Sequence, residues 1–168
     1  MVMGTQRFGR SPVVWFVIAA VMLVGIGTFA SGVLGMRDTA LDISSHDTYF
    51  VVARQHLVLA TALFCLACAA IYWAFSRILH RPLNRILSLI HVALTFVGSL
   101  GIYFPMHLIG ATTAPRRYYE YTEFDAMEGS GGIGNINLTV TGFAVLFVIG
   151  QLILLVNMIH TLIRRPDA

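Results

Sequence analysis

Apolar and polar positions divide the chain into four long apolar runs and the polar segments between them. The apolar runs cover about residues 12–35, 50–76, 86–110 and 136–163. Each is long enough to cross a bilayer as an α-helix, which takes about 20 residues at a rise of about 1.5 Å per residue. The pattern predicts an all-α fold, an integral membrane four-helix bundle that forms a single domain over residues 1–168.

The composition also indicates a membrane protein. Apolar residues make up 57% of the chain and charged residues 11%, against about 45–50% and about 25% in soluble domains. A water-soluble chain of 168 residues could not hide this much apolar surface, so we expect membrane lipid to surround it. All eleven basic residues are arginines, and most lie at the ends of the apolar runs. The net charge of +3 therefore indicates orientation in a membrane and not nucleic-acid binding.

The arginines predict how the chain is oriented. If the four runs cross the membrane in turn, seven arginines fall on the side of the two termini, namely Arg7, Arg10, Arg77, Arg81, Arg85, Arg164 and Arg165. Three fall on the other side, together with seven of the eight acidic residues. Because arginine in short loops marks the cytoplasmic side, we expect both termini in the cytoplasm. Arginine as the only basic residue and frequent alanine favour a bacterial inner membrane, with the mitochondrial inner membrane as the alternative.

Two ionisable residues, Arg54 and His56, lie inside the second apolar run, where such a group costs about 2.5–3.5 kcal/mol on insertion scales. Two residues apart on an α-helix, they point about 200° away from each other. Small residues near His56 (Ala53, Ala60 and Ala67) leave room for a flat macrocycle whose iron a neutral imidazole could ligate. The other interpretation is close packing of helices through small residues, with the histidine hydrogen-bonded across the interface.

Further candidates lie at the same predicted end of the bundle. His46-Asp47 is a fragment of a divalent-cation site that water or a partner chain would have to complete, or else a solvated helix cap. The arginine pair at 116–117 suits bidentate binding of carboxylates, or else balances nearby acidic residues. His107 lies at a depth comparable with that of His56, just after Pro105, which should bend its helix.

Several motifs occur in order along the chain. Residues 41–53 read LDISSHDTYFVVA, and residues 103–110 read YFPMHLIG and are followed by Pro-Arg-Arg at 115–117 and a tyrosine-rich, acidic segment. From about residue 32 to about residue 160, the chain resembles the last four transmembrane helices of cytochrome c oxidase subunit I, in the heme-copper oxidase superfamily. The topology inferred from the arginines agrees with that of this family.

The resemblance implies a role for particular residues. His56 matches the axial ligand of the low-spin heme, Arg116 and Arg117 match the pair that binds heme propionates, and His46 and Asp47 match the magnesium-binding pair near subunit II. Arg54 stands where the family has the ligand of its high-spin heme, and a guanidinium cannot ligate iron. The helices that carry the family's copper ligands have no counterpart here, so we expect no copper and no dioxygen reduction by this chain alone.

These features favour a degenerate, stand-alone relative that serves as a non-catalytic membrane subunit with respiratory oxidase partners. We expect one heme of b or a type on His56, with His107 or the His56 of a second copy as its other ligand, for respiratory electron transfer. Magnesium at a partner interface would use His46 and Asp47. Two alternatives stay open: the C-terminal piece of a split heme-copper oxidase subunit I, and a cofactor-free structural or assembly protein.

Overall fold

The structure, a computed structural model, describes residues 11–35, 48–81, 83–111 and 132–163. The elements in these ranges are all helical: α1 (Pro12–Gly35), α3 (Tyr49–Gln55), the π-helix η2 (His56–Ala60), α4 (Thr61–Leu79), α5 (Arg85–Ala111) and α7 (Gly132–Ile163). Because α3, η2 and α4 follow one another without a break, they form one continuous span from Tyr49 to Leu79. The described residues thus contain four helices long and apolar enough to cross a membrane, which confirms the predicted all-α membrane fold.

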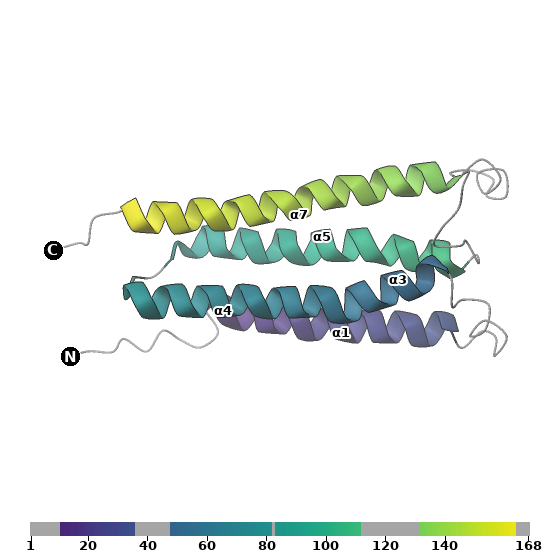
Figure 1. Cartoon of the computed structure of the whole chain (residues 1–168), viewed down its shortest axis with the longest axis horizontal. Helices are drawn as coiled ribbons and strands as arrows, with labels where there is room; N and C mark the ends of the chain where they lie inside the picture. Colours follow the sequence, from purple (N-terminus) through teal and green to yellow (C-terminus); the bar gives the residue numbers. More distant parts are fainter. Residues whose placement is uncertain (1–10, 36–47, 82, 112–131, 164–168) are drawn as a thin grey trace.

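The four spans lie side by side as rods, of which α1 is the shortest (Figure 1). Helix α5 packs against both α7 and α1, and α4 packs against α1. The beginning of α1 and the end of α7 lie at the same end of the bundle, as an even number of crossings requires (Figure 1). Helix α3 lies at the opposite end and packs against α5, as does η2, the turn that carries His56.

Helix boundaries follow local chemistry. Thr48 caps α3, since its Oγ1 accepts a hydrogen bond from the Phe50 amide at 3.3 Å. Helix α4 ends at Leu79, and the next residue, His80, adopts the left-handed conformation (φ 52°) common after helix C-termini. Helix α7 begins at Gly132, four residues before the expected start at 136. Once a long helix exists, each added residue gains one hydrogen bond, and this outweighs the low helix propensity of the glycines.

The buried side chains include residues from all four spans, among them Phe16, Leu23, Leu57, Tyr72 and Leu154. Cys65 and Cys68 are free thiols buried in the same cluster. Gly110 of α5 lies directly on the Phe50 backbone of α3, and a Cβ at this position would overlap it. Small residues allow backbones to approach in this way within a membrane. The contact fixes α3, and with it His56, against the end of α5.

A second feature holds the opposite half of the bundle together: a row of buried polar side chains. His91 of α5 lies between the Tyr72 hydroxyl of α4, at 3.1 Å, and Oε1 of Gln151 of α7, at 2.9 Å. Nearby, the Asn157 amide donates to the Ser88 hydroxyl at 3.0 Å and to the Asn84 carbonyl at 3.1 Å. These bonds satisfy polar groups that lipid could not and connect three of the four spans.

Candidate functional site

The candidate site begins where the second span changes its winding. At η2, the Thr61 amide donates to the carbonyl of His56, five residues back, so this turn is a π-helix. Such turns carry one extra residue, and they occur frequently at functional sites. His56 is the first residue of the turn. Of the three alanines expected beside it, Ala60 and Ala67 are exposed, whereas Ala53 is fully buried.

The two ring nitrogens of His56 differ in their hydrogen bonding. Its Nδ1 lies 2.7 Å from the carbonyl oxygen of Val52, one turn earlier. A carbonyl can only accept, so Nδ1 carries the hydrogen and donates it, which leaves the lone pair of a neutral ring on Nε2. The side chain is exposed, and its ring stacks on Tyr103 of α5, with centroids 5.4 Å apart and planes inclined by 22°. A hydrogen bond and a ring contact therefore orient the imidazole, and within the described ranges its Nε2 has no hydrogen-bond partner. Metal-ligating histidines are oriented in the same way, through a hydrogen bond at their other nitrogen.

His107 has a similar tautomer but the opposite environment. Its Nδ1 donates to the carbonyl of Tyr103 at 2.9 Å, and the side chain is fully buried. Its Nε2 faces the Ser31 hydroxyl of α1 at 3.4 Å, and the Phe50 ring packs edge-on against the imidazole. Both histidines thus contact Tyr103, but His107 Nε2 lies against the Ser31 hydroxyl of α1, whereas His56 Nε2 has no hydrogen-bond partner within the described part of the chain. This geometry argues against His107 as the second ligand of an iron on His56.

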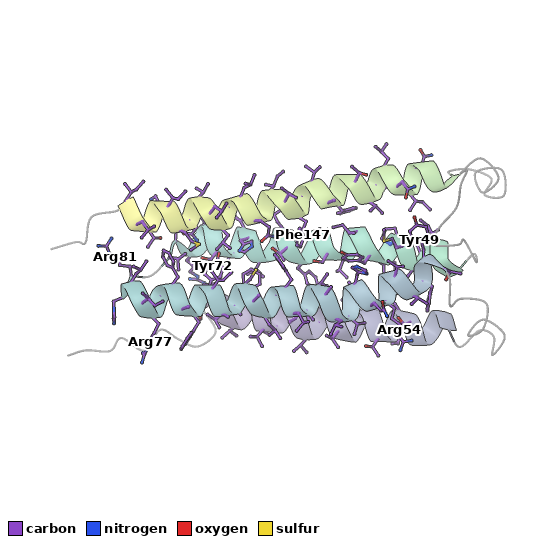
Figure 2. All side chains as sticks on the ribbon, viewed as in Figure 1. Tyr49, Arg54, Tyr72, Arg77, Arg81 and Phe147 are labelled. Carbon is purple, nitrogen blue, oxygen red and sulfur yellow. The ribbon has the colours of Figure 1, made fainter. Side chains whose placement is uncertain are left out.

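Arg54 is exposed, in the last turn of α3. Figure 2 shows Arg54 and Tyr49 at one end of the bundle and Arg77 and Arg81 at the other. The cation therefore occupies the same end as the candidate ligand His56.

The remaining predicted site residues, His46, Asp47, Arg116 and Arg117, lie outside the described residues. Within the described part of the chain, no group of three or more histidine, cysteine, aspartate or glutamate side chains could hold a metal ion. The magnesium pair and the propionate-binding pair therefore stay predictions.

Sequence reasoning missed Tyr103 as a partner of His56. It lies 47 residues further along the chain, and its position four residues before His107 indicates only that these two share a helix face. The Val52 carbonyl could have been anticipated, since it precedes His56 by one helical turn. The π turn, which sets the direction of the ring, has no sequence signal that we recognise.

The fold defines a multi-pass α-helical membrane protein, and the site defines an oriented histidine that is open at one nitrogen. Residues 1–146 match the family model described as cytochrome c and quinol oxidase polypeptide I, and the chain belongs to this family. It is 33% identical over 147 residues to an alternative cytochrome c oxidase subunit 1 of Bradyrhizobium diazoefficiens, a match that covers 84% of this chain and 24% of the relative. It is 35% identical over 148 residues to cytochrome c oxidase subunit 1 of Yarrowia lipolytica, covering 87% of this chain and 27% of the relative. The chain therefore spans about a quarter of the length of these relatives.

Proposed function

We propose that the chain is a membrane subunit of a respiratory oxidase-type complex and binds one low-spin heme, of b or a type, through Nε2 of His56. The observation that carries the proposal is the state of the exposed His56: Nδ1 is hydrogen-bonded to the Val52 carbonyl, and Nε2 has no hydrogen-bond partner among the residues that the structure describes. His56 and the Val52 carbonyl fit a heme, because histidines that ligate heme iron are neutral imidazoles whose other nitrogen is hydrogen-bonded.

Each residue has a part in this function. When bound, the heme would supply a one-electron redox centre for electron transfer. The Val52 carbonyl and the Tyr103 ring hold the His56 imidazole in one orientation. Arg116 and Arg117 would pair with the propionates. His46 and Asp47 would hold magnesium together with a partner chain.

Arg54 limits the chemistry of this chain. It occupies the position at which the resemblance places a second heme ligand, and a guanidinium has no lone pair to offer at any working pH. We propose that the chain alone holds one heme and no copper and does not reduce dioxygen. Its role would then be to transfer electrons to or from other oxidase subunits.

A second residue that holds the heme iron would come from outside the described residues. His107 Nε2 lies against the Ser31 hydroxyl of α1, whereas the Nε2 of His56 belongs to an exposed side chain. A second copy of the chain could supply its own His56, because a two-fold axis brings equal residues together. Another oxidase subunit could supply a histidine in the same way.

We further propose that the chain is a single membrane domain with both termini in the cytoplasm, in a bacterial inner membrane. The arginine distribution supports this orientation. The relatives come from a bacterium and from a yeast, so the mitochondrial inner membrane is the alternative.

Absorption spectra of the detergent-purified chain, oxidised and dithionite-reduced, test the heme proposal. We expect a sharp Soret band and an α-band, whose position separates b from a type. The His56→Ala variant should lose both, and His160→Ala, which removes an exposed histidine of α7 at the far end, should keep them. A chain that shows no Soret band after expression with ample heme, and after purification with its partners, would contradict the proposal.

One observation favours a second candidate function, the C-terminal piece of a split subunit I. The chain spans about a quarter of the length of its relatives, so three quarters of their sequence would have to come from elsewhere. Affinity purification of a tagged chain from its native membrane tests this. Mass spectrometry should then identify a separate polypeptide that matches the remaining part of subunit I. Purification without such a polypeptide would leave the single-heme subunit as the better account.

A further inference from the structure

A groove runs between α1 and α5, away from the candidate heme site. Its volume is about 280 Å³, and its lining is apolar: Trp15, Ile18, Ala19 and Met22 from α1, and Leu89, Val92, Ala93 and Phe96 from α5. Ala19 is buried and forms the floor, while Trp15 and Met22 are 40% and 48% exposed. The groove is therefore open along its length to whatever surrounds the bundle.

The depth of the groove matches one leaflet of a bilayer. Both helices run in the same direction from the same end, starting at Pro12 and Arg85 (Figure 1). The groove extends from Trp15 to Met22 on α1, which is about 5 to 15 Å from that end at 1.5 Å per residue. Half of a hydrocarbon core about 30 Å thick is about 15 Å. An acyl chain, which runs roughly parallel to the helices, would therefore lie along the groove.

Arg85 lies just beyond one end of the groove. Arg85 begins α5 and is exposed, and it lies one helical turn before Leu89, the first groove residue of that helix. Residues four apart lie on the same helix face, so Arg85 lies on the face of α5 that carries Leu89, about 6 Å beyond it along the helix axis. From the end of a span, a long arginine side chain can reach the level of the lipid headgroups. Arginine binds phosphate oxygens bidentately.

We propose that this groove binds one acyl chain of an anionic phospholipid whose phosphate pairs with Arg85. A transmembrane helix fits less well, because the groove covers only about two turns of each helix, whereas helix pairs pack over most of a span. The charge at the mouth favours an anionic headgroup over a zwitterionic one, by roughly fivefold for one arginine near the surface. The site is separate from His56 and does not depend on the proposed heme.

The two tryptophans allow a direct measurement. Trp15 lines the groove, whereas Trp73 of α4 is 60% exposed, outside the groove residues, and at a depth in the same leaflet. The full chain would be reconstituted in phosphatidylcholine vesicles that contain a small fraction of acyl-brominated phosphatidylglycerol or, in a parallel series, acyl-brominated phosphatidylcholine. Quenching of Trp15 is read in a Trp73→Phe chain, and quenching of Trp73 in a Trp15→Phe chain.

We expect Trp15 to be quenched at roughly fivefold lower fractions of the brominated phosphatidylglycerol than of the brominated phosphatidylcholine. Arg85→Gln should remove this preference, and Arg77→Gln, at the same end but on α4, should keep it. Ala93→Phe should fill the groove and reduce Trp15 quenching by either lipid. Equal quenching by the two lipids, or a preference that survives Arg85→Gln, would overturn the proposal. So would absence of quenching by both, which would show that protein covers the groove.

Discussion

At the scale of single residues, His56 and His107 are oriented by the same kind of hydrogen bond but differ in how far their side chains are exposed. In each, Nδ1 donates to a backbone carbonyl four residues earlier, at 2.7 and 2.9 Å. A helix carbonyl retains a second lone pair beside its backbone hydrogen bond, so neither bond disrupts the helix. Their exposure differs. His107 is enclosed by α1 and Phe50. His56 has the Tyr103 ring against one face of its imidazole, and its side chain is exposed.

Tyr103 gives a prediction at this scale. Replacing it with leucine removes the ring that stacks on His56, so the imidazole should rotate more freely about its bond to Cβ. We expect the low-spin electron paramagnetic resonance signal of the bound heme to broaden and shift in Tyr103→Leu. Tyr103→Phe keeps the ring and should keep the signal. An unchanged signal in the leucine variant would show that the stacking does not orient the ligand.

At the scale of elements, polar side chains and close contacts hold the helices together. Lipid gives helices no hydrophobic reason to associate, so interhelical hydrogen bonds and small residues decide which faces meet. The Gln151 amide donates to Thr95 Oγ1 and to the Phe147 carbonyl, both at 3.1 Å, which leaves its oxygen to accept from Nε2 of His91. The other nitrogen of His91 can then accept from the Tyr72 hydroxyl. The hydrogen bonds of each side chain thereby determine which atom of the next side chain donates and which accepts.

Asn157 provides the test of this arrangement. It is fully buried, and its side chain bonds the Asn84 amide at 2.9 Å and the Ser88 hydroxyl at 3.0 Å. We expect Asn157→Leu to lower the free energy of unfolding by about 1–2 kcal/mol, because it leaves these groups without their partner in lipid. Denaturation in micelles, followed by circular dichroism, measures the change. Asn135→Leu, at an exposed position of the same helix, should change stability little. Equal effects of the two substitutions would show that burial of Asn157 adds no stability.

At the scale of the whole molecule, the sequence predicted the number, type and approximate bounds of the spans. The length and apolarity of a span are local properties, so residues 12–35 and 86–110 could be assigned without knowledge of their neighbours. Which faces meet depends on residues far apart, such as His91 and Gln151 or His56 and Tyr103. The motif around His107 indicated a residue of interest, but only the packing of α1 and α3 showed that its free nitrogen is enclosed.

The orientation of the bundle is a prediction that belongs to this scale. In a chain with Cys65 and Cys68 replaced by alanine, His80→Cys and Asn135→Cys place single thiols at exposed positions near opposite ends. Since the arginine-rich end should face the cytoplasm, a membrane-impermeant maleimide should label position 135 in intact cells. Position 80 should react only after permeabilisation. The reverse pattern would invert the proposed topology.

The central claim is that His56 ligates heme iron, and chemical rescue tests it most directly. His56→Gly removes the imidazole and leaves a space of its shape on an exposed surface. We predict that the purified, heme-supplied variant lacks the low-spin absorption spectrum and regains it when free imidazole is added. Recovery would also show that the variant is folded. A variant that keeps the low-spin spectrum without imidazole would contradict the account, because another residue would then be the ligand.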